Sequence, residues 1–330
     1  MRVGTNNLIT DVAGISVGQS EDQTLKSGVT AVVGDAPFTA GVSVMGGAPG
    51  TRETDLLAPD KWVREVDALV LSGGSAFGLD AASGVMDGLR NDKRGFQVGE
   101  VNVPIVPAAI IFDLLNGGDK NWGANPYPDL GARAYANRGQ DIALGSHGAG
   151  IGAIAGDVKG GVGSASIILD SGITIGALVV VNSLGSPCVE GQRNFWAAPW
   201  EVDGEFGDLG LPATYAPLNT PAIPKLNVAE GGNTTIAVVA TDAPLHKSAC
   251  QRMATAAQDG IGRAIVPAHT PFDGDLVFGL STHQWQGEMG VIDPIMIGHA
   301  ASICLTRAIA RAVYLATPQD KDVVSCFQES

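Results

Sequence analysis

Three short apolar runs along the chain are typical of buried β-strands. Residues 68–71 and 173–181 are almost entirely aliphatic or small, and residues 234–241 combine β-branched with other apolar residues. Such runs, with little polar alternation, predict strands that are covered on both faces. Turn residues separate the β-branched runs at residues 30–33 and 41–44, which predicts a hairpin-like pair early in the sheet.

Other segments have the spacing of helices. We predict a helix over residues 76–90, after a glycine-rich corner, and another over residues 245–260, where apolar residues recur every three or four positions. Asp242 precedes a proline and is predicted to cap this second helix. An amphipathic helix is predicted over residues 293–316, and residues 266–280 are predicted to return as a strand.

Composition favours one sheet-rich domain. The 330 residues, 45% of them hydrophobic, suffice for a large core, and no low-complexity linker divides them, so we expect a single domain over residues 1–330. The 45 glycines, 18 prolines and few aromatic residues favour strands joined by tight turns. A formal net charge of −14 argues against nucleic acid or an anionic membrane as partner. Residues 191–232 show no periodicity, and a run of this length inside a compact domain is usually functional.

The cysteines suggest neither a disulfide framework nor a metal site. Cys188, Cys250, Cys304 and Cys326 include no C-x-x-C pair and have no ligand-like spacing with the five histidines, so we expect reduced thiols and no bound metal. The N-terminal region has no apolar signal segment, and no window is apolar over the length needed to span a bilayer. We therefore expect a cytoplasmic protein.

The stretch around Thr234 carries the candidate chemistry. Gly231 and Gly232 lead into an Asn233–Thr234 peptide and then into the predicted buried strand. If the bond before Thr234 is cut, the new α-amine lies next to the hydroxyl of the same residue, and an α-amine has a pKa of about 7.7 to 8. The amine would take the hydroxyl proton near neutral pH, as in enzymes with an N-terminal threonine nucleophile. Taken alone, the pattern is more often a plain loop entering a sheet.

Five blocks of sequence carry a resemblance to a known family. They lie at residues 8–18, 71–80, 159–163, 234–245 and 269–278. In this order along nearly the whole chain, they resemble blocks of the self-processing L-aminopeptidase/D-esterase peptidase family (P1, formerly S58), which includes β-aminopeptidases, a pantetheine hydrolase and a nylon-oligomer hydrolase. The Asn233–Thr234 junction is most similar to the last two branches, because the aminopeptidase branch typically has serine at the second position.

The resemblance implies a fold and a processing event. The fold it implies is an α/β, four-layer α/β/β/α sandwich of the N-terminal-nucleophile kind. The precursor is expected to cleave itself between Asn233 and Thr234 into a large subunit, residues 1–233, and a small subunit, residues 234–330. The Thr234 hydroxyl would attack the Asn233 carbonyl, an N-to-O acyl shift would give an ester, and water would release it. Succinimide formation at Asn233 is a rival route, which the β-branched Thr234 hinders.

The resemblance also implies roles for Asn182 and Lys159. Asn182 follows a predicted strand and by itself could be a turn former. The matching asparagine of the family points its amide at the scissile carbonyl, so we expect Asn182 to stabilise the oxyanion. Lys159 by itself is a typical turn lysine, whereas a lysine near this point in the family lies beside the nucleophile and would lower the pKa of its amine. Asp157 competes with Lys159 for the same aligned position.

Asp273 and Asp275 complete the expected site. Residues at i and i+2 fall on one side of an extended backbone, although an Asp-Gly turn or a D-x-D metal site gives the same pattern. The family carries a polar pair here, so the resemblance implies that Asp273 orients Thr234 and that Asp275 supports it. Phe112 stands where the aminopeptidase and nylon-hydrolase branches have an active-site tyrosine, which puts transfer of their substrate preference in doubt.

We therefore expect an aminopeptidase-like amide hydrolase that acts through an acyl-threonine intermediate and needs no cofactor. Its partner would be a small amide or peptide substrate: an α-peptide, a β-peptide, a pantetheine-like amide or an ω-amino acid oligomer. Two alternatives are an acyltransferase resembling ornithine acetyltransferase and an uncleaved, non-catalytic binding protein of the same fold. Relatives form homotetramers of cleaved protomers, so the resemblance implies a homo-oligomer.

Overall fold

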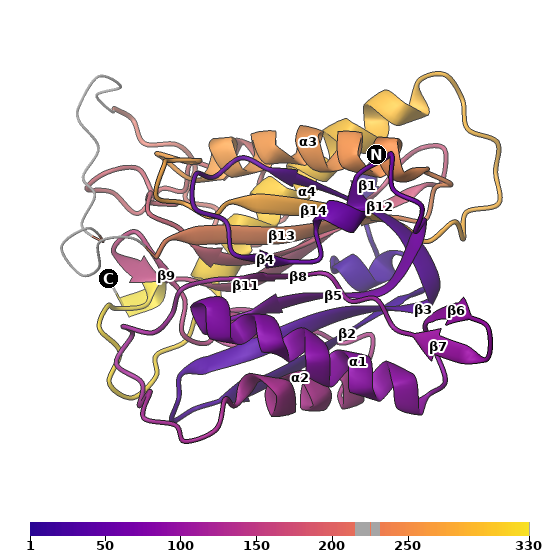
Figure 1. Ribbon diagram of the computed structural model, residues 1–330. Helices are drawn as coiled ribbons and strands as arrows, with labels where there is room; N and C mark the ends of the chain where they lie inside the picture. The colour runs from indigo at the N-terminus through magenta and orange to yellow at the C-terminus, as the bar shows by residue number, and fades with distance from the viewer. Residues whose placement is uncertain (215–224, 226–231, 330) are drawn as a thin grey trace.

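Two pairs of helices form the outer layers of the computed structural model, which describes residues 1–214, 225 and 232–329. Helices α3 (Lys247–Ala264) and α4 (Asp293–Tyr314) pack together on one face. Helices α1 (Ala81–Asn91) and α2 (Tyr127–Ala136) pack together on the other face, at the bottom of Figure 1. Among the described helices, none combines the length and apolar character needed to cross a membrane.

Ten of the described strands form one continuous sheet that supplies both inner layers. They are β1 (Arg2–Val3), β2 (Ile15–Asp22), β3 (Ser27–Val44), β4 (Thr51–Arg52), β5 (Glu65–Ser72), β8 (Ala108–Ile110), β11 (Gly161–Ile168), β12 (Thr174–Asn182), β13 (Thr234–Thr241) and β14 (Leu276–Ser281). Neighbours follow the order β1-β11-β12-β13-β14-β3-β5-β8-β4, and β2 pairs with β3. The first half of β3 pairs with β2 and β5, and its second half pairs with β14, so this one strand joins the two layers. Two small sheets consist of β6 (Phe96–Val98) with β7 (Val101–Val103) and β9 (Ile154–Ala155) with β10 (Val158–Lys159).

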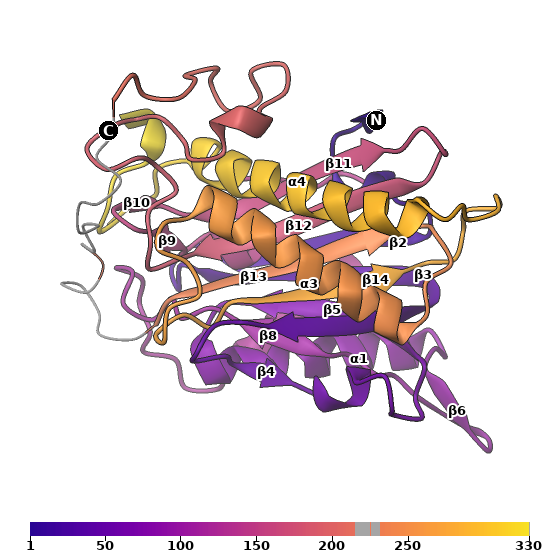
Figure 2. The ribbon, with the colours of Figure 1, turned by 90° about the horizontal axis from the view of Figure 1, so that it is seen from above.

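Three apolar clusters fill the spaces between four layers. The first lies between helices α3 and α4 and the strands β11 to β14, over which Figure 2 shows both helices running. The second lies between the two halves of the sheet. The third lies between strands β3, β5 and β8 and helices α1 and α2. Each sheet layer is therefore covered on both faces, and the predicted four-layer α/β/β/α sandwich is confirmed.

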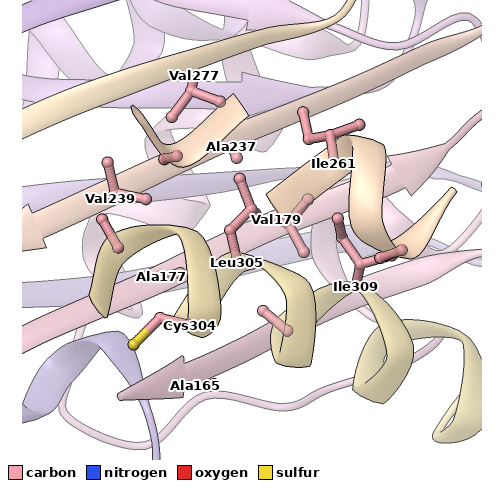
Figure 3. Packing of buried hydrophobic residues seen from close by; sticks show 14 of the residues in the cluster. Ala165, Ala177, Val179, Ala237, Val239, Ile261, Val277, Cys304, Leu305 and Ile309 are labelled. Carbon is pink, nitrogen blue, oxygen red and sulfur yellow. The ribbon is translucent and has the colours of Figure 1, made fainter. Parts of the chain in front are cut away.

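Side chains of β12 and β13 alternate between the first and second clusters. Ala177 and Val179 face the helices, with Ala237 and Val239 beside them, as Figure 3 shows. The intervening residues of both strands face the other half of the sheet. Continued with a period of two, this alternation directs the side chains of Asn182 and Thr234 into the space between the two sheet layers.

The predicted hairpin at residues 30–33 and 41–44 is wrong. Both runs belong to the single strand β3, and the turn residues between them produce a shift in its pairing register between Val33 and Phe38. An irregularity inside a strand accommodates Gly and Pro residues without reversing the chain. The first run pairs antiparallel with β2 on one side and β5 on the other.

Helix α3 begins later than predicted. Its N-cap is His246, whose Nδ1 accepts a hydrogen bond from Ala249 N. Asp242 instead accepts a hydrogen bond from Thr174 N at 2.9 Å, so its carboxylate joins strands rather than capping a helix. The last helix was predicted within two residues of its observed bounds, whereas α2 was not predicted. The aperiodic run at residues 191–232 lies partly outside the described residues.

The four cysteines are free and buried. Cys250 and Cys304 lie on the faces of α3 and α4 that pack against the sheet. Burial raises the pKa of each of these two thiols to about 12, so both stay protonated at neutral pH. They therefore serve as apolar packing groups.

Candidate active site

Thr234 and Asn182 lie opposite each other at one end of the sheet. Thr234 is the first residue of β13 and Asn182 is the last residue of β12, and the two residues pair in the antiparallel register. Both side chains are buried. The Thr234 hydroxyl Oγ1 lies 2.5 Å from the carbonyl oxygen of Asn233 and donates to it. The hydroxyl therefore contacts the carbonyl group of the peptide bond that precedes it.

A backbone amide also contacts this carbonyl. Gly274 N donates to Asn233 O at 2.8 Å, within a parallel bridge that joins Asn233 to Asp273. A Cβ atom at position 274 would lie 2.9 Å from Thr234 Oγ1, so only glycine allows the backbone to approach the hydroxyl this closely. Gly274 thus polarises the Asn233 carbonyl and borders Thr234 at once.

The Asn182 amide is directed one peptide earlier than expected. Its Nδ2 donates to Gly232 O at 3.1 Å and to Phe112 O at 3.0 Å, while its Oδ1 accepts from Ile154 N at 3.0 Å. The donor at the Asn233 carbonyl is therefore Gly274 N rather than the Asn182 side chain. The structure does not show the expected contact of the Asn182 amide with this carbonyl.

Asp273 and Asp275 hold the backbone on either side of Thr234. The Asp273 carboxylate accepts hydrogen bonds from the main-chain N and the hydroxyl of Thr270, at 2.9 and 2.6 Å. The backbone of Asp273 forms a parallel bridge with that of Asn233. Asp275 Oδ1 accepts from Thr235 N at 2.7 Å. Burial, helped by the negative charge of Asp275, raises the pKa of Asp273, although its hydrogen bonds oppose the shift.

His269 is the only histidine that contacts this pair among the described residues. Its Nδ1 lies 3.0 Å from Asp275 Oδ2, and its main-chain N donates to the same oxygen. Burial lowers the pKa of His269, but the proximity of Asp275 outweighs burial and the net shift is upward. The described residues contain no group of three or more His, Cys, Asp or Glu side chains that could hold a metal ion.

The ammonium of Lys159 is engaged away from Thr234. Lys159 Nζ donates to Asp322 Oδ2 at 2.8 Å, and Lys26 binds the other oxygen of the same carboxylate. Burial lowers the pKa of Lys159, although the contact with Asp322 opposes this. The main chain of Lys159 also donates to Ser325 O, so both its backbone and its ammonium bind the C-terminal segment. The competing Asp157 is exposed.

Lys225 is a neighbour of Asn182 that sequence reasoning did not single out. Its ammonium is buried and donates to Ile154 O and to Asn182 O, each at 2.7 Å. Burial lowers the pKa of Lys225 to about 7, while Asp273 and Asp275 oppose the shift. One lysine in an aperiodic segment gives no sequence signal of such a position.

Phe112 and Gly232 pack against each other just before the Asn233–Thr234 bond. A Cβ atom at position 232 would lie 2.5 Å from the Phe112 ring, and Gly232 has φ of +142°, which L-residues rarely adopt. The ring therefore borders the segment that leads to Thr234. Phe112 brings no hydroxyl to this place, as the sequence implied.

The side chain of Asn233 is buried, and the described residues offer its amide no hydrogen bond. Among the described residues, neither its Oδ1 nor its Nδ2 has a hydrogen-bond partner. Leaving a buried amide unpaired costs roughly 1–3 kcal/mol.

The family model described as Peptidase family S58 matches residues 7–322 of the chain. An uncharacterized aminopeptidase of Mycobacterium tuberculosis (strain ATCC 25618 / H37Rv) is 44% identical over 337 residues, which cover 94% of this chain and 95% of the relative. A 6-aminohexanoate-oligomer endohydrolase of Paenarthrobacter ureafaciens is 28% identical over 290 residues, covering 85% and 76% of the two chains.

The fold matches a solved structure over nearly its whole length. The L-aminopeptidase D-Ala-esterase/amidase from Ochrobactrum anthropi, described as a variant of the Ntn hydrolase fold, superposes with a TM-score of 0.69 at 23% sequence identity. The match covers 98% of this chain and 92% of that structure. At this level of identity the likeness establishes the shared fold.

Proposed function

Because the chain belongs to peptidase family S58 and is therefore a hydrolase of peptide or amide bonds, we propose that it processes itself and uses Thr234 as its nucleophile. The observation that carries the proposal is the contact of the Thr234 hydroxyl with the carbonyl of the bond to be cut. The threonine starts a fully buried strand whose register is fixed by β12. A nucleophile on such a strand is held rigidly.

In the self-cleavage step, Thr234 Oγ1 attacks the carbonyl carbon of Asn233. The new C–O bond replaces the C–N bond, the hydroxyl proton passes to the departing nitrogen, and an ester forms. Water then cleaves the ester, which restores the Thr234 hydroxyl and leaves a free α-amine on Thr234 and a carboxylate on Asn233. Gly274 N, which already donates to the Asn233 oxygen, would stabilise the oxyanion of this step.

Two features of the junction favour this route. Within the described part of the chain the buried Asn233 amide has no partner, and cleavage would let this group leave its buried position. The β-branched Thr234 hinders the rival succinimide reaction at Asn233. The ester route also accounts for a glycine at position 274, where any side chain would press on the hydroxyl.

In the mature enzyme, the α-amine of Thr234 would act as general base for its own hydroxyl. Cleavage would free Gly232 to move, so that the Asn182 Nδ2 group could donate to a substrate carbonyl in its place. Asp275 would orient the N-terminal threonine through its hydrogen bond with Thr235 N, and Asp273, whose backbone bridges to Asn233, would hold the end of the large subunit beside it. Lys159 receives no chemical role, because its ammonium is paired with Asp322.

The substrate would be a small amide or peptide. The relatives' names point to peptides with a free amine and to 6-aminohexanoate oligomers. Phe112 supplies an apolar ring rather than a hydroxyl at the cleavage site. We also propose a cytoplasmic location, which four free cysteines support, and an oligomer of cleaved protomers.

The test is hydrolysis of p-nitroanilides of L-alanine, β-alanine and 6-aminohexanoic acid by the purified protein. We expect at least one to be turned over, and Thr234→Ala to abolish the reaction. Adding an acceptor amine separates hydrolysis from acyl transfer: a product acylated on the amine in preference to water would indicate an acyltransferase. No turnover of any substrate class by an uncleaved chain would contradict the proposal and favour a binding protein.

A further inference from the structure

Lys225 is a buried lysine whose ammonium is bound by oxygen atoms of the protein. Lysines are rarely buried, because removing an ammonium from water is costly unless acceptors replace the solvent. Lys225 has four oxygen atoms within reach: those of Ile154 and Asn182 at 2.7 Å, Asn182 Oδ1 at 3.2 Å and Ser183 O at 3.3 Å. Three of the four belong to the end of β12, at Asn182 and the residue after it. The lysine is therefore built into the surroundings of Asn182.

The contact with Oδ1 determines which way the Asn182 amide faces. An amide side chain has one accepting end and one donating end. The Oδ1 end lies against two donors, Ile154 N and the Lys225 ammonium, and the Nδ2 end lies against two carbonyls. Turning the amide over would set its NH2 group against both donors. Lys225 and Ile154 together keep the donating end toward the cleavage site.

We propose that Lys225 is a positioning residue that fixes the Asn182 amide with its NH2 group toward the place of the Gly232 carbonyl, where a substrate carbonyl would bind in the mature enzyme. This inference rests on the proposed function, in which that NH2 group stabilises an oxyanion. Lys225 precedes Thr234 in the chain, so after cleavage it belongs to the large subunit. The end of the large subunit then remains part of the mature active site through this residue.

The electrostatics agree with this geometry. Burial lowers the pKa of Lys225 to about 7, and Asp273 and Asp275 are the charged groups that oppose the shift. The two carboxylates therefore lie near enough to act on the ammonium. Lys225 thus binds Asn182 directly and feels the charge of the aspartate pair.

The experiment is a double-mutant cycle between Lys225→Met and Asn182→Ala, measured with whichever p-nitroanilide the wild type hydrolyses fastest. Misplacing a catalytic group costs roughly 100-fold, so we expect Lys225→Met to lower kcat by about this factor and to leave KM within about 2-fold. In the Asn182→Ala background, the same change should alter kcat by no more than about 2-fold.

Lys247→Met is the matched control. Lys247 is also buried and donates to main-chain oxygens, those of Leu56 and Val63 at 2.8 and 2.9 Å, outside the site. The Lys247→Met variant should keep the wild-type kcat even if its melting temperature is lower. If Lys225→Met does not fold, Lys225→Gln is put through the same cycle.

Two results would overturn the inference while the proposed function stands. One is a wild-type kcat in the folded Lys225 variant. The other is a loss of kcat on Lys225→Met that is as large in the Asn182→Ala background as in the wild type. A wild type that neither cleaves itself nor hydrolyses any of the substrates removes the proposed function, and the inference falls with it. The wild type and the Lys247→Met control therefore distinguish the two failures.

Discussion

Single residues decide the chemistry at the start of β13. Thr234 contacts the carbonyl before it, Gly274 donates to that carbonyl, and Asn182 donates to the preceding one. The two donors thus bind neighbouring peptides. Under the proposed function, this division would give Gly274 the larger part in self-cleavage and Asn182 the larger part in turnover.

Asn182→Ala should therefore reduce hydrolysis more than self-cleavage. Loss of one oxyanion donor lowers kcat by roughly 100- to 1000-fold, or about 3–4 kcal/mol in the barrier. The measurement is kcat for the mature enzyme, beside the rate at which the small fragment appears. Asn116→Ala is a control of the same kind, because the Asn116 amide is buried and also donates to two carbonyls, those of Lys26 and Gly152. Equal kcat values for the two variants would contradict the role of Asn182.

Thr234 and Asn182 were selected because the family resemblance marks them; their places at the start of one apolar strand and the end of another do not by themselves indicate chemistry. Gly274 could be placed in a conspicuous Asp-Gly-Asp motif, but its contact with Asn233 depends on a bridge between distant segments. Lys159 was given a site role that its contact with Asp322 does not support. Lys225 could not be found, because its acceptors come from segments far away in the sequence.

At the level of elements, the hydrophobic pattern of the sequence predicted those strands and helices that depend on local sequence alone. The strands β12 and β13 and the helix α4 follow directly from apolar runs and helical spacing. Strand β3 was divided in two, because Gly and Pro residues are used there for an irregularity that only its pairing with β5 reveals. The start of α3 was misplaced, because Asp242 bonds to the neighbouring strand instead of to the helix.

The segment after α4 is joined to the rest of the molecule by Asp322. Its carboxylate binds Lys26, the residue before β3, and Lys159 of β10, both of which precede Thr234 in the chain. Burial raises the pKa of Asp322, but its bonds to Lys159 and Lys26 outweigh burial and the net shift is downward. The stabilisation is therefore present above the unfolded-state pKa of 3.8 and is lost as the pH falls through the lower folded-state value.

Asp322→Asn should destabilise the protein at pH 7 and have little effect in acid. Removing one partner of a buried ion pair costs roughly 3 kcal/mol, since the lysines lose their counter-charge. Thermal unfolding at pH 7, 5 and 3 should show melting curves that converge at the lowest pH. Asp170→Asn, which breaks an exposed pair with the N-terminal amine, should change little at any pH. A difference that stays constant with pH would rule out the ion pair as its cause.

For the whole molecule, cleavage would cut the chain without dividing the fold. Strand β13 would begin the small fragment, yet all eight of its residues pair with β12 of the large fragment. The buried Arg307 of α4 also binds Glu205 of the large part. The sheet and the ion pair would therefore hold the two fragments together.

We predict that the cleaved fragments elute as one species in size-exclusion chromatography and separate only in denaturant. Dividing 33.7 kDa in proportion to residues 1–233 and 234–330 gives about 24 and 10 kDa. Both bands should appear on a denaturing gel of the single native peak, and the native mass reports the number of protomers. Recovery of the small fragment in a separate native peak would contradict the shared sheet.

The most direct test of the central claim is intact mass and N-terminal sequencing of the protein after incubation near neutral pH, beside Thr234→Ala. The account predicts a small fragment that begins Thr-Thr-Ile in the wild type and an intact 330-residue chain in the variant. A wild-type chain that stays whole, or a cut at any other bond, would contradict the assignment of Thr234 as nucleophile.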